Sequence, residues 1–317
     1  ITSVATPKVA PEQHSFSSHT GNSYRFYNPL SEGITSLNPR KYTGGIQAVI
    51  LDWSGTTADA HVIAPARAFY EVFAKHGVPI TMKEAREPMG LRKDLHINKI
   101  LFSPEVKRRW TKVKGAEPTL QDSYELFQDF VPMQIECLPE YTDLLPGTVE
   151  AVNEIKNMGI TIGSTTGFTR DMVDVLLAAA QEQGYDPDIT VAGDEVENDM
   201  GFRPAPFMVY KNLVKMGVYP IQSVVKVDDT VTGVGEGLNA GCWAVGLANS
   251  SNYTNVDTIE QWNSMSEQQR NERIQYSRSV LEKASPHYVA DDISQLPEII
   301  RDINNRMARG EVPQGNY

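Results

Sequence analysis

The sequence predicts an α/β protein: a doubly wound, Rossmann-like parallel sheet with a block of helices inserted after its first strand. From residue 159 onward, short apolar runs alternate with longer stretches of helical periodicity, which favours parallel strands joined by crossover helices. Residues 62–141, in contrast, contain almost no strand-like alternation. We therefore expect a core domain of residues 46–61 and 142–317, a helical cap domain of residues 62–141, and an N-terminal arm of residues 1–45.

The first strand is the apolar run Ala48–Leu51, which ends abruptly in Asp52 and a Gly-Thr-Thr turn. In the cap, helical patterns begin near Val62, Arg92 and Leu120, and the first of them stops at Gly77-Val-Pro. The core then continues with further strands and helices in alternation. The expected strands are 159–166, 188–192, 223–229, 243–247 and 288–290, and the expected helices are 169–183, 205–216, 233–240 and 295–308.

Composition excludes some classes of protein. The chain has 317 residues and a formal net charge of −11, which argues against non-specific nucleic-acid binding. No apolar run approaches the roughly 20 residues of a membrane-spanning helix. Cys137 and Cys242 have no Cys or His cluster near them, so a reducing compartment is the simplest interpretation. We expect the cytoplasm, or an organelle matrix if residues 1–45 follow a removed targeting segment.

Chemically active side chains follow four of the predicted strands. Asp52 follows the first, Thr166 the second, Arg203 comes after the third, and Asp228 and Asp229 end the fourth. The carboxyl ends of parallel strands meet at one edge of a sheet. Together these residues offer a carboxylate able to attack phosphorus, a hydroxyl, a fixed cation and acids suited to Mg²⁺. Taken singly, each also fits an ordinary turn, a helix cap or a surface residue.

The order of these motifs resembles the haloacid dehalogenase superfamily, and the inserted helices resemble its smaller type of cap. The matching motifs are Asp52-x-Ser-Gly-Thr-Thr, Ser164-Thr-Thr166-Gly, Arg203-Pro and Asp228-Asp229-Thr. Within the cap, Pro88-Met-Gly-Leu-Arg-Lys-Asp-Leu-His96 resembles the cap motif of the phosphonatase (phosphonoacetaldehyde hydrolase) family. The resemblance covers about residues 46–301, which is most of the chain.

This resemblance implies hydrolysis of the C–P bond of phosphonoacetaldehyde to acetaldehyde and phosphate, a step of phosphonate degradation. It implies an imine on Lys93, an aspartyl phosphate on Asp52, and proton transfer by His96, three residues after Lys93 on the same helical face. It also implies a homodimer that meets through the cap helices. The remaining implied roles are substrate or phosphate binding by Met89, Thr166 and Arg203, and Mg²⁺ binding by Asp52, Asp229 and the backbone carbonyl of Ser54.

A lysine suits this chemistry because cleavage of a C–P bond would otherwise expel a carbanion. An amine that condenses with the neighbouring carbonyl forms an imine, and the protonated imine accepts the electron pair as an enamine. Lys93 then needs a lowered pKa, which desolvation under a closed cap can supply. Ser54 fits as well, since many phosphatases of the superfamily have a general acid at that position and an imine-activated leaving group does not need one.

Two departures from the family concern the metal site. Asp228 stands where the family usually has Gly, and Gly233 stands where it usually has an Asp that supports the metal. Because side chains alternate along a strand, we expect that Asp228 and Asp229 cannot easily face one ion together, which would weaken Mg²⁺ binding. Two alternative functions therefore stay open: a related Mg²⁺-dependent phosphonate or phosphate-ester hydrolase, and a degenerate, non-catalytic member that acts as a binding or scaffold protein.

Overall fold

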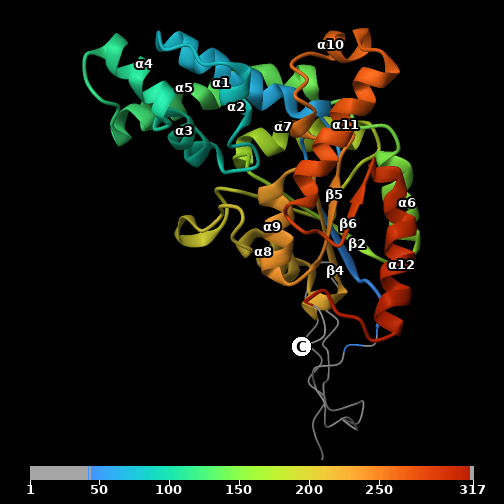
Figure 1. The fold of residues 1–317 in the computed structure, drawn as a ribbon. Coiled ribbons are helices and arrows are strands. Elements are labelled where there is room, and N and C mark those ends of the chain that lie inside the picture. The colour runs from blue at the N-terminus through green and yellow to red at the C-terminus, as the bar shows by residue number, and fades with distance from the viewer. Residues whose placement is uncertain (1–41, 43, 315–317) are drawn as a thin grey trace, which may run out of the picture. The chain divides into compact units, whose positions relative to one another are not determined.

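The computed structural model describes Tyr42 and residues 44–314, so the predicted arm of residues 1–45 lies almost entirely outside the described residues. Its centre is a six-stranded parallel sheet with the strand order β3-β2-β1-β4-β5-β6 (Figure 1). The strands are β1 Ala48–Leu51, β2 Thr161–Thr166, β3 Ile189–Ala192, β4 Val224–Asp228, β5 Trp243–Leu247 and β6 Tyr288–Ala290. The predicted fold class, a doubly wound parallel α/β sheet, is confirmed.

The central strand β1 pairs with β2 on one side and β4 on the other, so the strand order reverses next to it. Its four residues are fully buried, as expected for a strand of a parallel sheet that is covered on both faces. Val49 and Leu51 belong to the main hydrophobic core, whereas Ile50 points to the opposite face and packs with Val209 of α8. The crevice at such a reversal is where open α/β sheets bind ligands.

Helices cover both faces of the sheet (Figure 1). On one face, α8 (Phe207–Met216) contacts β2 and β3, and α9 (Val231–Ala240) contacts β4 and β5. On the other face lie α6 (Thr148–Asn157) and α12 (Leu296–Ala308), which contact each other. Around the carboxyl ends of the strands lie α7 (Arg170–Glu182), α10 (Ile259–Ser264) and α11 (Glu267–Glu282).

Five α-helices follow β1 and precede α6: α1 Ile63–Lys75, α2 Met82–Arg86, α3 Lys93–Leu101, α4 Pro104–Lys114 and α5 Leu120–Cys137. They stand together at one end of the sheet in Figure 1, and we call them the cap helices. The apolar face predicted for the first helix is buried: Ala64, Ala68, Val72 and Phe73 all belong to the core. Whether the cap helices form a separate domain stays a prediction.

Five α-helices were not predicted individually from the sequence: α2, α4, α6, α10 and α11. In α11, only Ser277 and Leu281 are buried, so the helix has no apolar stripe wide enough to be recognised. Among the described residues, no helix has the length and apolar character needed to cross a membrane.

Candidate active site

A small cleft between the cap helices and the carboxyl ends of the strands contains almost all of the predicted site residues. Met89 and Lys93 line it from the cap side, and Asp52, Ser54, Thr166, Arg203 and Asp229 line it from the core. Its free volume is about 20 Å³, which is room for about one water molecule. A cavity of about 490 Å³ elsewhere contains none of these seven residues, so chemistry and not size identifies the site.

Asp52 is held at the end of β1 by the neighbouring strand, because its backbone N–H donates to the carbonyl of Val227 in β4 over 3.0 Å. The side chain is buried, and burial together with the nearby Asp228 carboxylate raises the pKa of Asp52. One of its oxygens, Oδ1, lies 2.8 Å from Nη2 of Arg203. A fixed cation therefore faces the carboxylate that the sequence predicts as the nucleophile.

Arg203 is the centre of a buried network of charges. Its Nη1 lies 3.2 Å from Oδ2 of Asp228, and its Nε lies 2.9 Å from Oε2 of Glu236. Burial alone would lower the pKa of Arg203, but Asp228, Asp52 and Glu236 outweigh burial and raise it. The guanidinium is therefore permanently charged. Arg203 lines the cleft together with Asp52, as the order of the motifs predicts.

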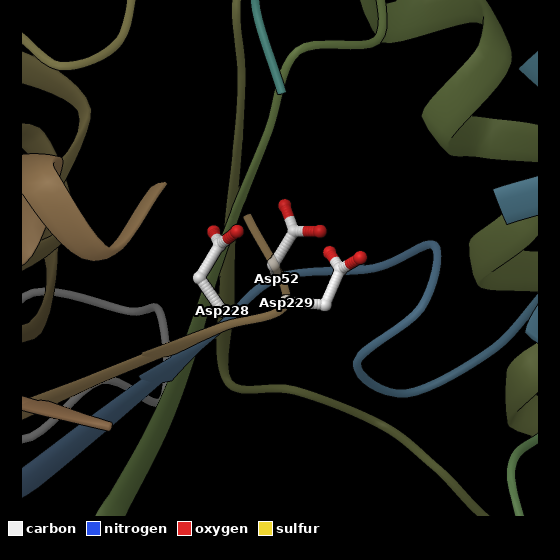
Figure 2. A group of neighbouring side chains, drawn as sticks. All are labelled: Asp52, Asp228 and Asp229. Carbon is white, nitrogen blue, oxygen red and sulfur yellow. The ribbon is translucent and has the colours of Figure 1, made fainter. Parts of the chain in front are cut away.

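The three aspartates at the strand ends form a cluster that suits a divalent cation. Asp52, Asp228 and Asp229 each offer an oxygen within 4.8 Å of the others, and Figure 2 shows the three carboxylates pointing to the same side. Oδ2 of Asp229 accepts a hydrogen bond from the backbone N–H of Asn252 over 2.8 Å, whereas Oδ1 is buried without a partner. Burial, Asp228 and Asp52 raise the pKa of Asp229 well above its usual range. A bound cation would satisfy the free oxygen and offset the repulsion between the acids.

The expectation that strand alternation separates Asp228 from Asp229 is wrong. Strand β4 ends at Asp228, so Asp229 already belongs to the following turn, where the two-residue alternation no longer applies. The two carboxylates therefore turn to the same side. Their environments differ: Arg203 and Lys226 outweigh burial and lower the pKa of Asp228, while the pKa of Asp229 is raised.

Lys93, the predicted imine-forming residue, lies inside the cleft. Its side chain is only 5% exposed, and its Nζ lies 4.3 Å from the centre of the Phe168 ring. No carboxylate or carbonyl of the described residues forms an ion pair or hydrogen bond with this nitrogen. Burial lowers the pKa of Lys93 to about 8, Arg203 adds to the lowering, and the carboxylates of Asp52, Asp59 and Asp229 oppose it. Lys93 also begins α3, where the helix dipole disfavours an ammonium group.

His96 is not brought into the cleft. It is fully buried one helical turn beyond Lys93, stacked on Phe69 with ring centres 3.8 Å apart. Its Nε2 donates to the carbonyl of Ala85 over 2.8 Å, which leaves Nδ1 unprotonated and without a partner. Burial and the nearby Lys93 lower the pKa of His96 well below its usual range, so the ring is neutral. The three-residue spacing does place both side chains against Phe69, but the cleft ends at the first turn of α3.

The cap is closed over the core. Thr232 Oγ1 donates to the carbonyl of Met89 over 3.3 Å. Gly90, at φ +92°, lies so close to the core that a Cβ there would come within 2.5 Å of Thr230 Oγ1 and 2.2 Å of Thr232 Oγ1. Only glycine fits this contact without displacing the hydroxyls. The closed position accounts for the small volume of the cleft.

A buried arginine connects the cap to the acid cluster. Arg86 of α2 donates to the carbonyl of His61 over 2.8 Å and to Oδ1 of Asn252 over 3.2 Å. Asn252 returns a hydrogen bond from Nδ2 to the carbonyl of Arg86, and its backbone N–H holds Asp229. Through Asn252, Arg86 of a cap helix is thus connected to Asp229, a predicted metal ligand.

Sequence reasoning missed four of these residues: Lys226, Glu236, Arg86 and Asn252. Lys226 is detectable in principle, because a lysine within the buried strand Val-Val-Lys-Val-Asp is unusual. Its Nζ lies 2.7 Å from Oδ2 of Asp228. Arg86 and Asn252 are 166 positions apart and show no local signal.

Comparisons with known proteins agree with this geometry. The model of the haloacid dehalogenase-like hydrolases matches residues 46–241. Phosphonoacetaldehyde hydrolases from Vibrio campbellii and Syntrophobacter fumaroxidans are 41% and 39% identical to this chain, cover 84% and 86% of it, and are each matched over 98% of their own length. A crystal structure of a phosphonoacetaldehyde hydrolase-like protein from Oleispira antarctica superposes with a TM-score of 0.82 at 37% identity, covering 86% of this chain and 97% of that one. The chain is therefore an enzyme of the haloacid dehalogenase-like hydrolases and belongs, within them, to the phosphonoacetaldehyde hydrolase family.

Proposed function

We propose that this enzyme hydrolyses the C–P bond of phosphonoacetaldehyde to acetaldehyde and phosphate, with an imine on Lys93 and a phosphoryl group transferred to Asp52. The observation that carries the proposal is the buried amine of Lys93, which lies in one cleft with Asp52 and Arg203 and has no hydrogen-bond or ion-pair partner among the described residues. The names of the relatives support the choice of substrate.

The proposed cycle begins when the neutral amine of Lys93 adds to the aldehyde carbon, and uptake of one proton with loss of water leaves a protonated imine. A carboxylate oxygen of Asp52 then attacks phosphorus, the C–P bond breaks, and its electron pair moves into the imine to form an enamine. A proton adds to the enamine carbon, and water hydrolyses the imine to acetaldehyde and free Lys93. A second water hydrolyses the aspartyl phosphate, which releases phosphate and restores Asp52.

The other cleft residues fit supporting roles. Arg203 lies beside the attacking oxygen of Asp52, where it can balance charge on the phosphonyl oxygens. The hydroxyl of Thr166 lines the same cleft and can donate to one of those oxygens. Asp52, Asp229 and the carbonyl of Ser54 would hold Mg²⁺, which when bound would supply positive charge that stabilises the transferring phosphoryl group.

We propose a positioning role for His96 in place of the proton transfer expected from the sequence. A neutral ring stacked on Phe69 adds no charge next to Lys93 and fixes the aromatic face that Lys93 also approaches, with Nζ 5.8 Å from the centre of the Phe69 ring. A protonated histidine at this position would lower the pKa of Lys93 further. Protons for the enamine must then come from water or from groups that face the cleft.

The cap has to open during the cycle. A cleft of about 20 Å³ holds about one water molecule, and phosphonoacetaldehyde is several times larger. Closure after binding would expel water, which keeps Lys93 desolvated and protects the imine from early hydrolysis.

We further propose that the enzyme is a homodimer that meets through the cap helices. Four large apolar side chains are exposed on these helices: Tyr70 (41%), Val113 (55%), Leu120 (74%) and Tyr124 (56%). Burying exposed apolar side chains of this size in a protein contact would be favourable. Sedimentation analysis of the enzyme and of Leu120→Lys tests this assembly, and dissociation of the variant is the expected outcome.

Borohydride trapping tests the function directly. With phosphonoacetaldehyde present, reduction should leave an adduct on Lys93 that mass spectrometry locates, and Lys93→Arg should form no adduct and have no turnover, since a guanidinium does not condense with an aldehyde. The matched control is Lys99→Arg, an exposed lysine of the same helix α3.

Each of the other outcomes would indicate a different function. Mg²⁺-dependent phosphate release without an adduct would indicate a phosphate-ester or different phosphonate hydrolase. Absence of both adduct and phosphate release would indicate a non-catalytic binding protein. Turnover of phosphonoacetaldehyde by Lys93→Arg would rule out the imine.

A further inference from the structure

The carboxylate of Asp228 fills the space in which a side chain at position 233 would lie. A Cβ placed on Gly233, in the first turn of α9, would come within 1.9 Å of Cγ and Oδ2 of Asp228. Distances below 3.0 Å require one group to move, and Asp228 is fully buried. A side chain at position 233 and the observed position of the Asp228 carboxylate are therefore mutually exclusive.

Both oxygens of the Asp228 carboxylate have polar partners within the protein. Oδ1 accepts from the backbone N–H of Thr230 over 3.0 Å and from its hydroxyl over 2.7 Å. Oδ2 lies 2.7 Å from Nζ of Lys226 and 3.2 Å from Nη1 of Arg203. Asp229 differs, because its Oδ1 has no hydrogen-bond partner in the part of the chain that the structure describes. Although Asp228 belongs to the acid cluster, its oxygens are already used to hold two cations.

Arg203 forms ion pairs with Asp228 and Glu236, which do not line the cleft, and with Asp52, which does. Nε of Arg203 contacts Glu236, Nη1 contacts Asp228, and Nη2 contacts both Asp52 and the hydroxyl of Thr165, 2.8 Å away. Two of the three charged contacts thus come from residues that do not line the cleft. Without Asp228, one edge of the guanidinium would lose its charged partner, and Lys226 would keep only Glu236, 3.8 Å away, as a counter-charge.

We propose that Asp228 is a positioning residue that aims Arg203 at the phosphonyl group, and that glycine at position 233 is required because Asp228 occupies its side-chain space. The proposal rests on the proposed function in one respect: Arg203 must contact the phosphonyl or phosphate oxygens. It assigns Asp228 to anion binding and leaves the metal to Asp52, Asp229 and Ser54.

The test is a double-mutant cycle measured by calorimetric titration of inorganic phosphate into the Mg²⁺-loaded enzyme. Gly233→Ala pushes the carboxylate away and Asp228→Gly removes it, so each should weaken phosphate binding about 10- to 100-fold, as expected for a charge-assisted contact. In the Asp228→Gly background, Gly233→Ala should change phosphate binding less than about 3-fold, because the space is vacant. The matched control is Gly246→Ala, whose Cβ would meet Leu281 no closer than 3.4 Å.

Titration of Mg²⁺ alone into Asp228→Asn separates positioning from metal binding, since asparagine keeps the shape and can still accept from Thr230. Positioning predicts Mg²⁺ affinity within a few-fold of the parent enzyme and weakened phosphate binding. Loss of Mg²⁺ affinity with intact phosphate binding would make Asp228 a metal ligand and overturn the proposal. Unchanged phosphate binding in Gly233→Ala would also overturn it. Phosphate binding needs no C–P cleavage, so failed borohydride trapping would refute the proposed function and leave this inference standing.

Discussion

Burying Lys93 should cost stability in a way that depends on pH. The pKa of Lys93 falls from 10.5 to about 8 on folding, which corresponds to about 3 kcal/mol at 1.36 kcal/mol per pKa unit. Between these two pH values the folded protein has lost the proton while the unfolded chain keeps it, so stability rises with pH across this window. The full penalty is present below about pH 8 and is gone above about pH 10.5.

Replacing Lys93 with methionine removes the charge and keeps an unbranched side chain of similar length. We expect Lys93→Met to be inactive and yet more stable than the parent at neutral pH, with a stability difference about 3 kcal/mol larger near pH 7 than near pH 10.5. The gain arises because no ammonium group has to be desolvated next to Arg203.

Urea unfolding of both proteins at a series of pH values measures this difference. Groups that do not interact with Lys93 titrate alike in the two proteins, so their contributions cancel in the comparison. The control is Lys99→Met on the same helix, where the exposed side chain should give a difference that does not vary with pH. A constant difference for Lys93→Met across the whole range would refute the claim that the amine is desolvated.

Three further predictions concern the reaction and the metal. Asp52→Asn should lower turnover at least about 10³-fold while borohydride still traps the Lys93 adduct, and a lost adduct would contradict the separate roles of the two residues. The rate of imine formation should rise with pH up to about 8, because only the neutral amine of Lys93 adds to an aldehyde; a rate that is flat below this pH would count against the lowered pKa. Arg86→Met should weaken Mg²⁺ binding about 10-fold in calorimetry, since Asn252 loses the partner that fixes its hold on Asp229; unchanged affinity would mean that Asn252 is positioned without the cap.

Much of the site could be predicted because it consists of strand ends. Asp52 follows an apolar run and Asp229 follows another, and parallel pairing brings such positions to one edge whatever the rest of the chain does. Lys93 and Met89 were found through a short cap motif, and both line the cleft. Helices were predicted where an apolar stripe is wide, as in α1, and missed where it is narrow, as in α11.

The sequence could not predict which buried side chains contact one another once the cap is closed over the core. The spacing between Lys93 and His96 correctly put them on one helical face, but which turn of that face meets the cleft depends on how deep α3 sits against Phe69. Strand alternation misplaced Asp229, because the strand ends one residue earlier. The link from Arg86 to Asn252 joins distant parts of the chain and exists only once the cap has docked.

By itself, the sequence determined the alternation of strands and helices, the order of the acidic, hydroxyl and basic residues at the strand ends, and the presence of a lysine in the inserted helices. These features follow from patterns of neighbouring residues, so they can be predicted without knowledge of the tertiary structure. Only the tertiary structure decided that this lysine is desolvated, that Arg203 is held between Asp52 and Asp228, and that Gly233 leaves room for a carboxylate. Burial, charge pairing and steric exclusion depend on distances between residues far apart in sequence, and packing alone sets those distances.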